Sequence, residues 1–135
     1  MAHEILSVKL CQLDDRIGKL HSRIRMSDKN SHIQLRKECD SLKQELCEAQ
    51  STLHENLCYS KSNLVSVLAQ SYEKMEQVRQ EAMEQIQETV ENSLNPETIV
   101  EEQILLAEYA LDFAQQAADR ALLLSLEAID AQMIS

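Results

Sequence analysis

Apolar residues recur at helical spacing along nearly the whole chain, and two short polar stretches interrupt the pattern. In the first, at 27–31, Ser31 followed by Gln34 predicts a capping box that opens a new helix. In the second, Asn95 is followed by Pro96. This pair predicts another helix start, because Asn is a favourable N-cap and Pro costs nothing at the first helical position. The pattern therefore predicts helices at residues 3–26, 32–93 and 97–134.

The first 57 residues carry a heptad repeat, in which apolar positions advance by four and then three residues. The row in the first helix is Leu6, Leu10, Leu13, Ile17, Leu20 and Ile24. The row that follows the turn is Leu35, Cys39, Leu42, Leu46, Ala49 and Leu53. Folding the chain about 27–31 opposes the two rows, which predicts an antiparallel helical hairpin over residues 1–57.

From residue 58 onward the apolar repeat lengthens to eleven residues. Its rows are Leu64, Met75 and Ile86 before Pro96, and Val100, Leu111, Leu122 and Met133 after it. Because eleven residues average ~3.67 per turn, this repeat favours straight or slightly right-handed packing. It predicts a second hairpin over residues 58–135, continuous with the first.

An uninterrupted helix over 32–93 would be ~90 Å long, far beyond the dimensions of a compact domain of this size. The sequence thus predicts an all-α, elongated, three-helix antiparallel coiled-coil rod, with helices 3–26 and 97–134 folded back onto opposite ends of the long helix. An alternative rests on residues 59–63, where Ser and Asn side chains compete for backbone hydrogen bonds. A break there would permit a compact monomeric bundle instead.

The helix at 97–134 is apolar around about twice the arc of an ordinary surface helix, so one neighbouring helix cannot cover it. Alanines between two apolar ridges allow close helix approach. We therefore expect two chains to associate into a dimeric four-helix bundle. The predicted self-association or partner interface consists of Leu106, Ala110, Phe113, Ala117, Leu124 and Ala128.

A charged residue also falls on the apolar stripe of the helix that precedes Pro96. Arg79 lies there, and pairing about Asn95 and Pro96 sets it opposite Asp112. Such a pair would fix the register of the two helices. The alternative is that Arg79 extends along its own helix to solvent.

The composition supports an all-helical chain and limits its partners. One Gly and one Pro in 135 residues cannot supply the turns of a sheet protein. The formal charge of −10 disfavours nucleic acid and anionic membrane surfaces as partners. Residues 1–60 balance nine basic against nine acidic side chains, whereas residues 61–135 carry four basic and fourteen acidic ones. That acidic half is either a solvated surface or a docking surface for a basic protein.

No catalytic, metal or cofactor motif is present in the sequence. A carboxylate-bridged metal site needs Glu-x-x-His spacing, which the chain lacks, and no glycine-rich phosphate loop occurs. The cysteines have no CxxC spacing, and free thiols are expected. Cys39 lies on the heptad row and is expected to pack in its core, whereas Cys58 lies at the weak junction. Cys11 and Cys47 would face each other across the first hairpin, where redox pairing is a minor alternative.

Nothing in the sequence indicates export or membrane insertion, so a cytoplasmic location is expected. Charges run through the first twenty residues, and uncharged runs such as 121–126 are far shorter than the ~20 residues that span a bilayer. The favoured function is non-enzymatic, as a coiled-coil adaptor, spacer or assembly subunit that homodimerises. The alternative is a helical binding or chaperone-like module that is monomeric alone and takes a client helix on the apolar face of helix 97–134.

Overall fold

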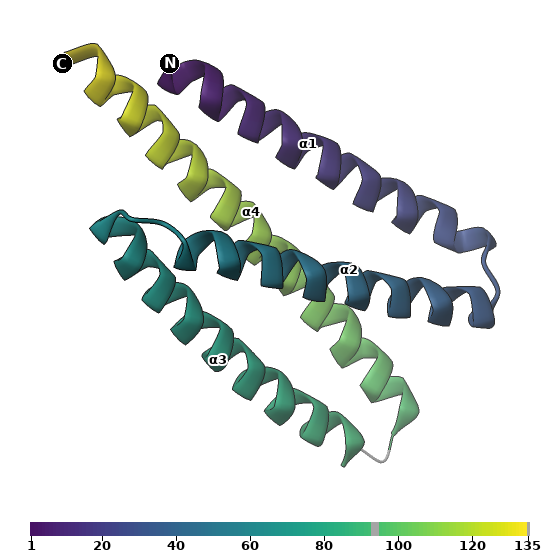
Figure 1. The fold of residues 1–135 in the computed structure, drawn as a ribbon. Helices are drawn as coiled ribbons and strands as arrows, with labels where there is room; N and C mark the ends of the chain where they lie inside the picture. Colours follow the sequence, from purple (N-terminus) through teal and green to yellow (C-terminus); the bar gives the residue numbers. More distant parts are fainter. Residues whose placement is uncertain (93–94, 135) are drawn as a thin grey trace. The chain divides into compact units, whose positions relative to one another are not determined.

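The protein is helical along almost all of the part that the computed structural model describes, residues 1–92 and 95–134 (Figure 1). The α-helices are α1 (Ala2–Met26), α2 (His32–Cys58), α3 (Asn63–Glu91) and α4 (Pro96–Ile134), and a short 3₁₀ turn, η1 (Ser27–Lys29), follows α1. No strand occurs within the described ranges. The predicted all-α class is confirmed.

The capping box predicted at the start of α2 is present in full. The Ser31 hydroxyl accepts a hydrogen bond from the backbone N–H of Gln34 at 3.2 Å. In return, the Gln34 side-chain oxygen accepts from the Ser31 backbone N–H at 2.8 Å. Two N–H groups that α2 could not satisfy internally are thereby paired, which fixes where the helix begins.

Replacing Ser31 with Ala tests this cap. We expect Ser31→Ala to lower the free energy of unfolding by about 1 kcal/mol, because the N–H of Gln34 loses its acceptor. Thermal unfolding followed by circular dichroism measures the effect. Ser22→Ala is the matched control, since the Ser22 hydroxyl bonds to the Gly18 carbonyl inside α1 and caps no helix start. Equal melting temperatures for the two variants would contradict a stabilising role for the cap.

The start of α4 also follows its prediction. Pro96 is the first helical residue. The Asn95 side-chain oxygen accepts a hydrogen bond from the backbone N–H of Glu97 at 3.1 Å. The Asn95 carbonyl accepts the first helical hydrogen bond, from Ile99 at 3.2 Å. Asn95 therefore acts as the N-cap.

The prediction of one helix over 32–93 is wrong, because the structure breaks it into α2 and α3. Residue 93, its predicted end, lies outside the described residues. Tyr59 closes α2, and Ser62 adopts an extended backbone and caps α3 by accepting from the Val65 N–H at 3.4 Å. The Ser60 hydroxyl accepts from the Ser62 N–H at 3.3 Å. Side-chain oxygens thus replace helical hydrogen bonds at the break that the alternative had placed at 59–63.

The helices group into two units. In the first, α1 packs against α4 and the two run antiparallel (Figure 1). The backbone N–H of Ala2 donates to the Gln132 side-chain oxygen at 3.0 Å, which ties the start of α1 to the end of α4. In the second unit, α2 and α3 form an antiparallel hairpin about the break at 59–62.

The hairpins predicted over 1–57 and 58–135 join residues that belong to different units. They therefore stay predictions, as does the pairing of the heptad row of α1 with that of α2. Most residues of both heptad rows are exposed, among them Leu10, Ile17 and Leu46. Residue 135, the predicted end of the second hairpin, lies outside the described residues.

No side chain in the described ranges is buried, although the chain is 44% hydrophobic. The least exposed positions are only half-buried, and most large apolar side chains lie open to solvent. Exposed apolar area on this scale is unusual for a soluble protein and is typical of surfaces that associate with other proteins.

Candidate functional site

The predicted interface forms one exposed stripe along α4. Its large side chains stand well out of the helix: Phe113 is 67% exposed, Leu124 66% and Leu106 36%. At 3.6 residues per turn, these three positions share one direction to within about 20°. The alanines Ala110, Ala117 and Ala128 are likewise exposed and lie along the same stripe. We call this set of six residues the outer face of α4.

Within the first unit, α1 packs against a side of α4 that differs from the outer face. Ala118, Ser125 and Ile129 are half-buried there. Together with leucines of both helices, they line an apolar cavity of about 370 Å³. On the α1 side the lining includes Leu6 and Leu10. The direction of this contact lies about 110° around α4 from the outer face, so α1 does not cover the outer face.

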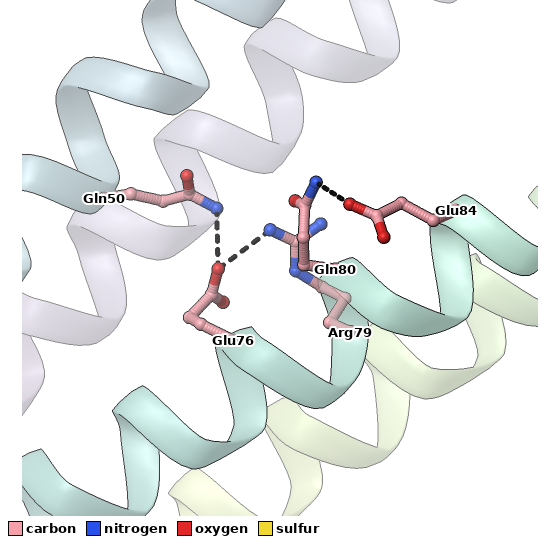
Figure 2. Close-up of polar contacts among 5 residues, drawn as sticks. All are labelled: Gln50, Glu76, Arg79, Gln80 and Glu84. Carbon is pink, nitrogen blue, oxygen red and sulfur yellow. Dashed lines mark hydrogen bonds and ion pairs between the residues drawn. The ribbon is translucent and has the colours of Figure 1, made fainter.

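A polar layer joins α2 to α3 in the second unit (Figure 2). The Gln50 amide donates to Glu76 Oε2 at 3.1 Å, and Arg79 donates to the same oxygen at 2.8 Å. One turn along, the Gln80 amide donates to Glu84 at 3.3 Å. A single oxygen of the Glu76 carboxylate therefore accepts hydrogen bonds from both helices.

Arg79 therefore has its ion pair on its own helix, with Glu76. Asp112 belongs to the other unit and is part of α4. The Arg79–Asp112 pair stays a prediction.

The row of α3 residues that packs against α2, called the seam of α3 below, was not predicted by the eleven-residue repeat. Half-buried residues on α3 include Val65, Ala69, Tyr72 and Glu76, which advance by four, three and four residues as in a heptad row. Arg79, Met83, Ile86 and Val90 continue the same steps. The signal was present in the sequence, but polar residues at two of the eight positions weakened it.

Tyr72 lies on this seam and lines a shallow depression of about 300 Å³ between α2 and α3, together with Gln50, His54, Glu73 and Glu76. Burial raises the pKa of Tyr72 above its ordinary value of 10.0, and the Glu76 carboxylate raises it further, while Arg79 opposes them. The folded hairpin thus favours the neutral phenol.

This pKa shift predicts a pH dependence. Since folding raises the pKa of Tyr72, its contribution to stability is complete below the unfolded pKa of about 10 and is lost as the pH rises through the folded pKa. Urea unfolding of the Tyr59→Phe/Tyr109→Phe variant at increasing alkaline pH, with and without Tyr72→Phe, measures it. The variant that keeps Tyr72 should lose stability more steeply. Parallel curves would show that Tyr72 ionisation does not bear on folding.

The four cysteines, Cys11, Cys39, Cys47 and Cys58, are free and exposed. The expectation that Cys39 lies in a heptad core is therefore not met. Within residues 1–92 and 95–134, no three His, Cys, Asp or Glu side chains converge as the ligands of a metal ion would. In the same ranges, none of the helices combines the length and apolarity needed to cross a bilayer.

Comparison with known proteins gives no relatives. No protein-family model, curated protein sequence or solved structure matches the chain. The interpretation of function therefore depends on the residues alone.

Proposed function

We propose that this protein is a non-enzymatic coiled-coil interaction protein that homodimerises through the outer face of α4 and serves as an adaptor, spacer or assembly subunit. The observation that supports it most directly is the exposure of Phe113 and Leu124 on a side of α4 that α1 leaves open. Aromatic and leucine side chains at such density are costly to leave in water and contribute most when an interface buries them.

The charge distribution of α4 supports a second copy as the occupant. Its acidic row consists of Glu101, Glu108, Asp112, Asp119 and Asp130. These residues point about 130° or more away from the outer face. A two-fold contact through the outer face therefore keeps the two acidic rows apart, so the net charge of −10 does not oppose it strongly.

The small residues of the outer face support the same arrangement. Ala110, Ala117 and Ala128 alternate along it with the large side chains. In an antiparallel pair of α4 helices, the large residues of one chain can fill the spaces above the alanines of the other, at a short interhelical distance. A four-helix cross-section, with one α1 and one α4 from each chain, is the resulting proposal for the dimeric bundle.

The second candidate function is a helical binding module that is monomeric alone. The apolar cavity between α1 and α4 favours it, because such a cavity beside the exposed leucines of α4 suits the apolar side of a client helix. On either proposal the protein works in the cytoplasm without catalysis, nucleic acid or a membrane, and its acidic α4 row is available to a basic protein partner.

Light-scattering mass on a size-exclusion column tests the first proposal, at several concentrations and under reducing conditions. A mass of twice 15.4 kDa supports the homodimer. A mass of 15.4 kDa at every concentration overturns it and leaves the client-binding function as the proposal to pursue.

A further inference from the structure

Three side chains at the closed end of the α2–α3 hairpin form a chain of contacts. Cys58 Sγ lies 3.6 Å from His54 Nε2. On the other side of the ring, His54 Nδ1 lies 3.6 Å from Glu73 Oε1. His54 and Glu73 remain 49% and 58% exposed, and Cys58 is exposed as well. A thiol, an imidazole and a carboxylate thus follow one another at a surface that small molecules can reach.

The fold brings this set together from two helices. His54 and Cys58 are four residues apart, which places them one above the other on α2. Glu73 comes from α3 and reaches His54 because the break at 59–62 turns α3 back along α2. The sequence spacing therefore indicates the contact between His54 and Cys58, but it does not indicate the contact between His54 and Glu73.

The order of the three groups suits proton transfer from the thiol. A thiolate, not a thiol, attacks sulfur and carbon electrophiles. With its Nδ1 proton directed at Glu73, the His54 ring presents the Nε2 lone pair to Cys58, and the Glu73 carboxylate stabilises the imidazolium that forms. The neighbouring groups of α3 are Tyr72 and Glu76. Since Glu76 already accepts from Gln50 and Arg79, Glu73 is the carboxylate paired with His54.

We propose that Cys58 is a site of thiol–disulfide exchange with low-molecular-weight disulfides, with His54 as its proton acceptor and Glu73 as a positioning residue. The Cys58 proton moves to His54 Nε2, and the thiolate attacks one sulfur of the small disulfide. Its S–S bond breaks as a new S–S bond to Cys58 forms. The other half leaves as a thiolate, which takes up the proton, so Cys58 is oxidised and the released half is reduced.

The other cysteines provide an internal comparison. Cys11, Cys39 and Cys47 are exposed like Cys58. Among the described residues, Cys58 is the cysteine whose sulfur contacts a histidine ring. Cys47 is the closest comparison, because it lines the depression between α2 and α3 together with His54 and Glu73.

Glutathione disulfide is the probe for the test, used on the full, reduced chain in the absence of oxygen. Peptide mass spectrometry at successive times gives the rate of modification at each cysteine. At about pH 6.5 we expect Cys58 to react about tenfold faster than Cys47, since few isolated thiols are ionised there. His54→Gln should remove this difference, and Glu73→Gln should reduce it. His21→Gln is the matched control and should leave it unchanged.

The pH profile separates proton transfer from accessibility. If His54 accepts the proton, the Cys58 to Cys47 rate ratio is largest in mildly acidic solution and falls towards one in alkaline solution, where hydroxide removes thiol protons without help from an imidazole. A ratio that stays constant with pH would show that Cys58 differs only in exposure, and would overturn the proposal. Equal rates at the two cysteines would also overturn it. The same holds if the His54→Gln variant is folded by circular dichroism and its cysteines react at the rates of the unaltered protein.

Discussion

Phe113→Asp is expected to halve the mass of the protein in solution, from a dimer to a monomer of 15.4 kDa. Phe113 is the largest side chain of the outer face of α4, and two copies meet there in the proposed interface. Burying a Phe stabilises an interface by about 1.5–3 kcal/mol, and burying an unpaired carboxylate in its place costs several more. A combined change of about 4 kcal/mol weakens association roughly a thousandfold.

Light scattering of Phe113→Asp at matched concentrations measures this change, with circular dichroism to show that the helices persist. The control is Gln115→Asp, which adds the same charge to the same helix about 160° away from Phe113. The Gln115→Asp variant should have the same mass in solution as the unaltered protein. A Phe113→Asp protein that is still dimeric would reject the outer face as the interface, and a different side of the molecule would have to be considered.

Ile129→Asp is expected to separate α1 from α4 within the first unit. Ile129 is half-buried and lines the cavity between the two helices with Leu6, Leu10 and Leu13. A carboxylate at this position removes apolar contact and draws water between the helices, at a cost of about 2 kcal/mol. Urea unfolding should show a lower midpoint, and limited proteolysis should cut α1 sooner.

Ile129→Val is the control for this change, since it keeps the position apolar and should cost about 1 kcal/mol or less. Should Ile129→Asp and Ile129→Val unfold at the same urea concentration, the α1–α4 contact would contribute little to stability.

Features that depend on a few neighbouring residues were predictable from the sequence. The capping box at Ser31 and the N-cap at Asn95 each need a side chain and a backbone N–H two or three positions away, so their residues suffice to identify them. The weakness at 59–63 was equally visible, because Ser60 and Ser62 carry the competing hydroxyl groups. Whether that weakness becomes a break depends on what packs on either side of it, which local sequence does not state.

Which residues of α2 meet α3 could not be predicted from the sequence. On α2 the heptad row offers Ala49 and Leu53, yet the residues that meet α3 are Gln50 and His54, one position further around the helix. A shift of one residue rotates the contact by about 100°, which exchanges an apolar row for a polar one. Hydrophobic periodicity identifies the most apolar row of a single helix. A hydrogen bond such as Gln50–Glu76 depends on residues of two helices, so the pattern of one helix does not predict it.

The pairing of the first helix with the last also bears on how the chain folds as it is synthesised. The hairpin of α2 and α3 joins segments that follow one another closely, and it can form as soon as α3 leaves the ribosome. By contrast, α1 and its partner α4 are separated by that whole hairpin. At ~5–20 residues per second, α1 waits on the order of ten seconds for α4. Throughout that interval its leucines lack their partner from the first unit, which makes the nascent chain the state in which α1 most needs protection from aggregation.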